Sequence, residues 1–181
     1  DPMELVNDPD IQVIVEVMGG VERAYEVVRA AILAGKHVVT ANKALLAERG
    51  AEIWNLAEEQ GVDLYYEAAV AGGIPIIRVL REALASERIL AIRGIVNGTS
   101  NYILSRMTEE GLSFEVALAE AQAAGYAEAD PTLDVGGGDA AHKLALLAAI
   151  AFGGPPRLDA VHVEGIDALQ GIDFLHAARL G

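Results

Sequence analysis

The chain has 181 residues, which is enough for one domain with a sizeable core or for parts of two. It is 52% apolar, contains no cysteine and has a formal net charge of −14. The lack of cysteine excludes disulfides, zinc–thiolate sites and thiol nucleophiles. The acidic balance argues against a nucleic-acid partner, because phosphate binding needs a basic surface.

The longest apolar stretch, Leu144 to Phe152, is far shorter than the ~20 residues that a helix needs to cross a bilayer. No signal-peptide pattern opens the chain. Alanine, leucine, valine and isoleucine alternate with short glycine turns, as is typical of α/β proteins. We therefore expect a cytoplasmic α/β protein that makes no contact with a membrane.

The first part of the chain alternates between expected strands and helices. Strands are expected at Ile11–Val17, His37–Thr40 and Asp63–Glu67, and helices at Val21–Leu33 and Lys43–Gln60. Short connections between such elements are typical of right-handed crossovers in a parallel sheet. This pattern predicts part of a nucleotide-binding domain.

A sheet of this kind normally opens with a strand, a G-x-G-x-x-G turn and a helix that holds the cofactor pyrophosphate. No such turn is present, the chain begins with Asp-Pro and no initiator methionine, and its first strand already has the character of a central one. We therefore expect a fragment that starts partway through a nucleotide-binding domain.

The character of the sequence changes after Gly72 and Gly73, where we place a domain boundary. The second part, residues 72–181, is also expected to mix helices and strands and to be incomplete at its C-terminus. Strands are expected at Arg88–Val96 and near Leu158–Val163. Helices are expected at Ile74–Leu84, Ser100–Met107, Ser113–Ala124, Asp139–Phe152 and from Gly171 to Gly181.

The stretch GYAEADPTLDVGGGDAAHK, residues 125–143, gathers acids ahead of a strongly apolar helix. Asp139 and Lys143 are four residues apart and so share a helix face. An exposed ion pair, worth only ~0.2–0.5 kcal/mol, would explain them. The apolar run that follows indicates a buried helix instead, and a lysine entering it is a candidate proton donor. The three glycines at 136–138 allow the backbone to approach something closely.

Three acids in the same stretch, Glu128, Asp130 and Asp134, leave several alternatives open. They form a solvated loop, a cage for a cationic group such as the ammonium of an amino acid, or a site for a hard cation. The metal site is the least attractive of these, because the nearby lysine competes for the same negative charge.

Two further segments follow expected strands and open helices. Lys43 falls at the carboxyl end of a strand, where open α/β sheets bind ligands, and at a helix start, where the helix dipole disfavours a cation. This placement is a modest sign of function. In the segment Asn97–Asn101, helix capping explains the Thr or Ser, whereas a substrate carboxylate at the helix N-terminus would explain the whole cluster, and capping is the simpler interpretation.

The turn from Glu67 to Pro75 is apolar apart from its glutamate. Carbonyls freed by its glycines could line a monovalent cation site, but on spacing alone a plain strand-to-helix turn is the better interpretation. The histidines show no metal-ligand spacing, and we interpret each as structural: His37, His142, His162 and His176.

Four stretches of the chain closely resemble the homoserine dehydrogenase family, in the order in which that family has them. They are VTANKALLA, YYEAAVAGGIPIIRVLRE, RGIVNGTSNYILSRM and, most specific of all, GYAEADPTLDVGGGDAAHKLALLAAIAFG. The resemblance runs from Ile11 to about Asp167. It implies a fragment that lacks the family's N-terminal cofactor glycine motif and its C-terminal end.

This resemblance implies NAD(P)-dependent interconversion of L-aspartate 4-semialdehyde and L-homoserine, a step on the route to threonine, methionine and isoleucine. It implies a partial Rossmann-like nucleotide-binding domain, residues 1–71, followed by an α/β catalytic and dimerisation domain, residues 72–181. The implied cofactor is NADP or NAD, with a structural sodium ion. The implied partners are a small amino-acid substrate and a second copy of the chain.

The resemblance also assigns roles to individual residues. Lys143 matches the proton donor to the aldehyde oxygen, Asp139 the acid beside it, and Lys43 a catalytic lysine near the nicotinamide. Glu128 matches the acid that holds the substrate ammonium. The other matched positions line the substrate pocket (Asp134, Thr99, Tyr126), adjoin the cofactor (Gly19, Gly20) or form a sodium-binding turn (Glu67, Val70, Gly72, Ile74).

Two rival functions differ from this prediction in chemistry or in class. Aspartate-semialdehyde dehydrogenase forms a thioester on a cysteine, and the chain has no cysteine. The other rival is a non-catalytic dimerisation fragment of homoserine dehydrogenase, which would form a dimer and have no affinity for the cofactor.

Overall fold

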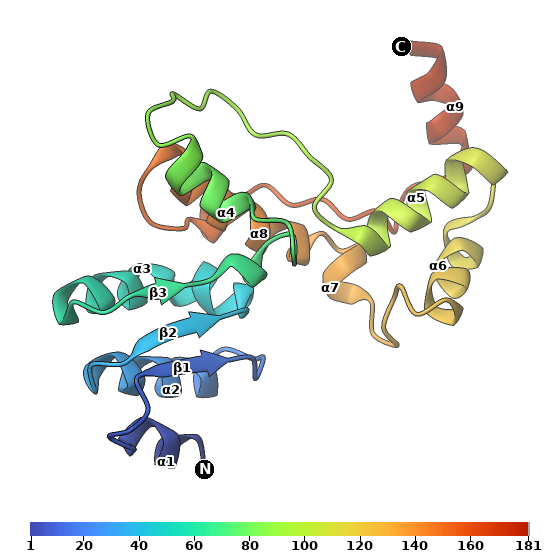
Figure 1. Ribbon diagram of the computed structural model, residues 1–181. Helices are drawn as coiled ribbons and strands as arrows, with labels where there is room; N and C mark the ends of the chain where they lie inside the picture. The colour runs from blue at the N-terminus through green and yellow to red at the C-terminus, as the bar shows by residue number, and fades with distance from the viewer. Residues whose placement is uncertain (181) are drawn as a thin grey trace. The chain divides into compact units, whose positions relative to one another are not determined.

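The computed structural model describes residues 1–180 of the chain (Figure 1). The described residues form two compact units. The first unit contains residues 1–92 and 142–161, and the second contains residues 93–141 and those from 162 onward. None of the described helices is long and apolar enough to cross a membrane. The boundary expected near Gly72 stays a prediction.

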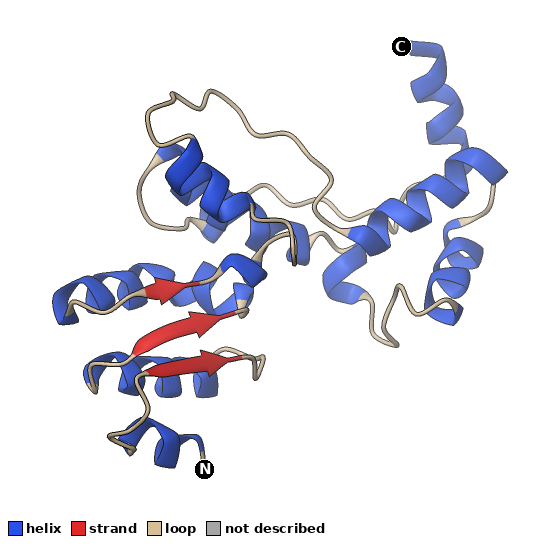
Figure 2. Ribbon diagram, viewed as in Figure 1, coloured by secondary structure: helices blue, strands red, loops and turns tan. Residues whose placement is uncertain are grey.

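The first unit is built on a three-stranded parallel sheet in the order β1-β2-β3 (Figure 2). The strands are β1 (Val13–Glu16), β2 (His37–Thr40) and β3 (Leu64–Tyr65). The crossovers between them are the helices α2 (Glu22–Leu33) and α3 (Lys43–Gln60). This arrangement confirms the expected alternation of strand and helix.

One face of the sheet forms the core of this unit. Ile14 of β1 and its register partner Val38 of β2 are buried in one cluster with Val28 and Ile32 of α2 and Ile53 of α3. The alternation of side chains along a strand puts their neighbours on the other face. Val15 and Tyr65 on that face are 64% and 57% exposed.

Local signals explain where α3 begins and ends. The side chain of Asn42 accepts a hydrogen bond from the Leu45 N–H at the helix start, and Gly61 ends the helix with a φ of 66°. Two further helices complete this unit apart from α8. They are α1 (Pro2–Asn7), which was not expected, and α4 (Ile76–Arg78), which a π-helical turn continues over Val79–Ala83.

The second unit is helical over its described residues. Ile103 and Met107 of α5 pack with Ala117 and Ala121 of α6 and with Val135 of α7 in a second core. The helix α8 contributes its first turn to this unit and its remainder to the first. The helices of the second unit are α5 (Gly98–Glu110), α6 (Phe114–Ala123), α7 (Thr132–Val135), α8 (Gly138–Phe152) and α9 (Gly171–Leu180).

Two expected strands are wrong. Residues 88–97 have no regular secondary structure, and residues 158–163 contain a 3-10 turn, Leu158–Ala160. A strand is stable when its N–H and C=O groups pair with a neighbour, and no described segment pairs with either stretch. Leu90 and Ile95 are accordingly 79% and 77% exposed. The helix expected from Gly171 is confirmed, although Gly181 lies outside the described residues.

Candidate functional site

Two acidic residues of the second unit, Asp134 and Asp139, contact the side chain of Asn97. The Asn97 Nδ2 donates hydrogen bonds to Asp134 Oδ1 at 2.6 Å and to Asp139 Oδ2 at 2.8 Å. The Asn97 Oδ1 accepts from the Ser100 N–H at 2.7 Å and caps α5. Asn97 and Asp139 are both buried. Capping of this helix is confirmed, but the cap is Asn97 and not the expected Thr or Ser, and the amide also bridges two carboxylates.

The glycines at 136–138 make this meeting possible. A Cβ on Gly136 would lie 2.7 Å from the Thr132 carbonyl oxygen, and one on Gly137 would lie 2.9 Å from Val163 Cγ1. Gly137 also has a φ of 83°, which other residues rarely adopt. The close approach that the glycines permit is therefore to the protein's own chain. It lets α7 and α8 follow each other tightly, so that Asp134 and Asp139 reach one amide.

Thr99 and Tyr126, which are expected to line the substrate pocket, are linked by a hydrogen bond from a side chain to a backbone carbonyl. The Thr99 Oγ1 donates to the carbonyl of Tyr126 at 2.6 Å. The Tyr126 ring lies 4.9 Å from the ring of Tyr102, and Tyr126 remains 60% exposed. The Ser100 Oγ donates to the Asp134 carbonyl at 3.1 Å. The start of α5 thus contacts both the Tyr126 and the Asp134 segments.

The other acids of this stretch have different surroundings. Asp130 Oδ1 accepts from the Thr132 N–H and hydroxyl at 3.1 and 2.6 Å, and the hydroxyl above all holds the pKa of Asp130 below its ordinary value. Asp130 therefore stabilises the turn that leads into α7. Glu128 is exposed, which leaves it accessible to a ligand. No group of metal-ligating side chains occurs among the described residues.

Lys143 and Asp139 lie one turn apart in α8, as their spacing predicts. Asp139 is 5% exposed, and Lys143 is half-buried. Several side chains in the remainder of the helix are buried: Ala145, Leu146, Leu147 and Ala149. The expectation that this helix is largely buried is therefore confirmed.

The first unit has its own buried polar network, at the carboxyl ends of β1 and β2. Glu16 is 2% exposed, and its carboxylate accepts from the Thr40 hydroxyl at 2.6 Å and from the Met18 N–H at 2.7 Å. The Thr40 Oγ1 accepts from the Asn42 N–H at 3.0 Å, and the Asn42 Nδ2 donates to the Gly20 carbonyl at 2.6 Å.

This network holds the segments on which the predicted cofactor residues lie. Gly19 and Gly20 form an exposed turn with φ values of 75° and 71°, and Lys43 is the first residue of α3. Sequence reasoning gave Glu16 no role. The signal that could have found it is an acid inside the otherwise β-branched run IQVIVEV, because a buried carboxylate needs donors.

The residues of the predicted sodium turn follow β3. Both carboxylate oxygens of Glu67 accept backbone N–H groups at the start of α4, from Ile77 at 2.9 Å and from Arg78 at 3.0 Å. Glu67 thereby satisfies donors that a helix start leaves unpaired. Val70 is buried, whereas Gly72 and Ile74 are exposed.

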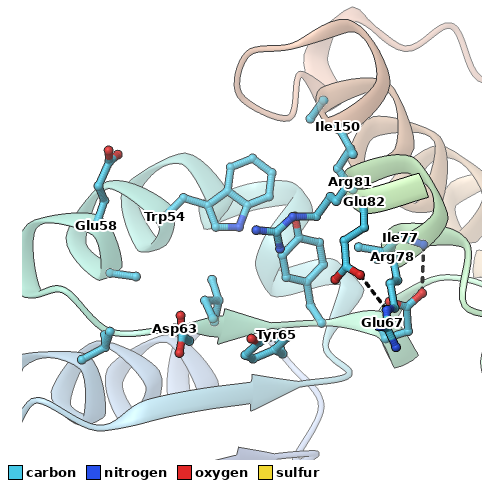
Figure 3. A pocket seen from close by; sticks show the side chains of 15 residues that line it. Trp54, Glu58, Asp63, Tyr65, Glu67, Ile77, Arg78, Arg81, Glu82 and Ile150 are labelled. Carbon is cyan, nitrogen blue, oxygen red and sulfur yellow. Dashed lines mark hydrogen bonds and ion pairs between the residues drawn. The ribbon is translucent and has the colours of Figure 1, made fainter. Parts of the chain in front are cut away.

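A cavity of about 650 Å³ opens beside β3 and α4 (Figure 3). Trp54 and Arg81 line this cavity, and the ring centroid of Trp54 lies 5.8 Å from that of Tyr66, on which it stacks. Charged side chains of both signs from neighbouring elements complete the wall. Burial raises the pKa of Tyr66. The mixed charge of this wall indicates no particular ligand, and of the predicted site residues only Glu67 contributes to it.

The parallel sheet with helical crossovers and a polar network at its carboxyl edge defines an α/β protein with a Rossmann-like nucleotide-binding fold. The family model described as "Homoserine dehydrogenase, NAD binding domain" matches residues 1–67, and the family model described as "Homoserine dehydrogenase" matches residues 75–181. The chain therefore belongs to the homoserine dehydrogenase family. This finding confirms the resemblance.

Individual relatives agree with the family match. Homoserine dehydrogenase of Neisseria gonorrhoeae is 56% identical over the whole chain, which spans 42% of that relative. A crystal structure of a homoserine dehydrogenase from Thiobacillus denitrificans has a TM-score of 0.97 at 54% identity, over the whole chain and 42% of the other. A hyperthermophilic archaeal homoserine dehydrogenase in complex with NADPH has a TM-score of 0.83 at 34% identity, over 94% of the chain and 53% of the other.

Proposed function

We propose that the natural protein containing this chain is an NAD(P)-dependent homoserine dehydrogenase that interconverts L-aspartate 4-semialdehyde and L-homoserine. Its place would be on the route to threonine, methionine and isoleucine. The observation that carries the proposal is the Asn97–Asp134–Asp139 cluster in a chain of this family, with Lys143 one helical turn after Asp139 in α8.

The chemistry needs a proton donor at the aldehyde oxygen. When bound, a nicotinamide cofactor supplies or accepts the hydride at the reacting carbon. The Lys143 ammonium stabilises the negative charge that develops on the oxygen and then protonates it. Asp139, four residues earlier in the same helix, orients that ammonium. The exposed Glu128 binds the substrate ammonium, and Asp134, Thr99 and Tyr126 line the pocket.

In the first unit we assign the Gly19–Gly20 turn and Lys43 to the cofactor site of the natural protein. The Gly19–Gly20 turn lies at the carboxyl end of β1, where sheets of this type bind dinucleotides, and a Cβ on either glycine would meet no atom within 4 Å. The turn is thus open to a ligand. Lys43, at the start of α3, is placed by the Asn42 cap and is assigned to the nicotinamide side. The cofactor is NADP or NAD.

The test of this function is turnover by the purified natural protein. We expect oxidation of NADPH or NADH only when L-aspartate 4-semialdehyde is added, and reduction of NADP⁺ or NAD⁺ only with L-homoserine. The L-homoserine analogue without its amino group serves as the control and should be a poor substrate, because it lacks the ammonium that Glu128 binds. Dimer formation without cofactor affinity or turnover would support a non-catalytic dimerisation fragment instead.

A sodium ion at the turn after β3 belongs to the same proposal. The donors are the Glu67 carboxylate and the carbonyls of Val70, Gly72 and Ile74, an all-oxygen set that suits a hard cation. The Glu67 carboxylate also accepts two helix N–H groups, so that its remaining lone pairs would face the ion. We expect a higher unfolding temperature in sodium chloride than in choline chloride at equal ionic strength, and no such difference in Glu67→Gln.

Two further properties belong to this proposal, a homodimeric state and a cytoplasmic location. The exposed apolar side chains Leu90 and Ile95 support dimer formation, because a second copy could cover them. Light scattering on the purified natural protein measures the mass directly, and a monomer at micromolar concentration would contradict the dimer.

A further inference from the structure

The orientation of the Asn97 carboxamide is defined on both sides. Its oxygen faces a backbone N–H, that of Ser100, and its nitrogen faces two carboxylate oxygens, of Asp134 and Asp139. A flipped amide would put its oxygen against both carboxylates, so that only one orientation is compatible with these partners. All three contacts are between 2.6 and 2.8 Å.

Helix capping does not explain why this residue is an asparagine. A cap needs only an acceptor for an N–H of the first turn, and aspartate or serine supplies one as well as asparagine does. The two hydrogen bonds from Nδ2 are additional to the cap. They use both N–H groups of the amide, one for each carboxylate.

The two carboxylates require such a donor. One oxygen of each carboxylate lies within hydrogen-bond distance of the same nitrogen atom, so the two carboxylates are close together. Like charges at such short range away from bulk water repel strongly. An amide between them offers one positive N–H edge to each without adding a net charge. A cation in its place would compete with Lys143 for Asp139.

We propose that Asn97 is a positioning residue of the active site, which holds the carboxylates of Asp134 and Asp139 side by side at the start of α8. This inference rests on the proposed function and deepens it, because it names the group that makes two neighbouring acids compatible. Asn97 touches the acids and has no contact with the substrate in this role.

The sharpest test is Asn97→Asp in the natural protein that contains this chain. Aspartate keeps the helix cap but replaces the donor with a third negative charge. We expect kcat/KM for L-homoserine to fall by about a hundredfold, because misplaced catalytic groups cost on this order. Asn97→Ser, which keeps the cap and offers one donor, should lose about tenfold. The matched control Asn101→Asp, at an exposed position of the same helix, should stay within about twofold of the wild type.

A purely capping role predicts that Asn97→Asp and Asn97→Ser both keep activity near that of the wild type, because all three residues cap a helix about equally well. If Asn97→Asp stays within about twofold of the wild type, the positioning role is overturned. Circular dichroism of each variant separates a loss of activity from a failure to fold.

A swap variant tests the hydrogen bond independently of activity. In N97D/D139N the amide and the carboxylate exchange places, and one donor again faces one acceptor. We expect the swap to recover much of the unfolding temperature that Asn97→Asp loses, while turnover stays low because the acid beside Lys143 is gone. Additive losses of unfolding temperature in the swap would overturn the positioning role. If the wild type is inactive but the swap still recovers unfolding temperature, the proposed function is wrong and the role of Asn97 in holding the two acids still stands.

Discussion

The two units of this protein each contain a buried polar network built on a capping asparagine, and the two networks differ in what the asparagine binds. Asn42 caps α3 and donates its amide to a neutral group, the carbonyl of Gly20. Asn97 caps α5 and donates its amide to two carboxylates.

A capping asparagine therefore has a different second role in each unit. In the first unit the acid, Glu16, is satisfied by a hydroxyl and a backbone N–H, and the network joins two turns at the edge of the sheet. In the second unit the amide itself satisfies two acids and concentrates negative charge. The first arrangement joins two turns of the fold, whereas the second, in our proposal, positions two acids of the active site. Substitutions in the two networks should therefore affect different measurements.

The largest effect is expected at Lys143. Lys143→Ala should lower kcat by about 10²-fold or more, because the reaction loses its general acid. The matched control is Lys36→Met in the first unit, since Lys36 donates to the backbone carbonyls of Asp8 and Ile11. The control should lower the unfolding temperature and leave kcat of the folded enzyme nearly unchanged. Near-normal turnover in Lys143→Ala would remove Lys143 from the mechanism.

The next effect is expected at Glu16 and concerns stability. Glu16→Ala leaves the buried Thr40 hydroxyl and the Met18 N–H without their acceptor, which should cost about 1–3 kcal/mol of unfolding free energy. Chemical denaturation measures this loss. The control Glu26→Ala removes an acid that is exposed on α2 and should cost under about 0.5 kcal/mol. Equal losses in both variants would show that the network contributes no more than a surface ion pair.

A smaller effect is expected at Glu128, the exposed acid of the second unit. Glu128→Gln should raise KM for L-homoserine by about tenfold with little change in kcat, because it weakens binding of the substrate ammonium. Asp130→Asn, two residues away, is the control, since Asp130 already accepts hydrogen bonds from Thr132. A KM that is the same in Glu128→Gln and the wild type would discard this ammonium site.

The smallest effect is the pH dependence that Asp130 contributes. Hydrogen bonds from Thr132 lower its pKa in the folded state below the ordinary 3.8. Its contribution to stability is therefore present above about pH 3.8 and is lost as the pH falls through the lowered pKa. The unfolding temperature of the wild type should drop more steeply than that of Asp130→Asn between about pH 4 and 2. Parallel curves would show that the hydrogen bonds do not stabilise the ionised form.

Much of the secondary structure could be predicted because its signals are local. The bounds of α3 follow from a capping asparagine and a terminal glycine, and the positions of β1 and β2 follow from β-branched runs. The four-residue helix α7 was missed because it is barely one helical turn long and cannot show a repeat of the helical period. The strand expected at Arg88–Val96 was wrong because apolar alternation reports a preference for a strand, whereas a strand also needs a paired neighbour.

The candidate site divides in the same way. Sequence alone placed Asp139 and Lys143 on one helix face, because that relation is a property of the helix. It also carried the family resemblance that assigns their chemistry. Tertiary structure alone decided that Asn97 bridges acids 37 and 42 residues away, and that Thr40 meets Glu16 across 24 residues. A hydrogen bond between distant residues depends on how the chain folds back on itself, and no local pattern records where that return occurs.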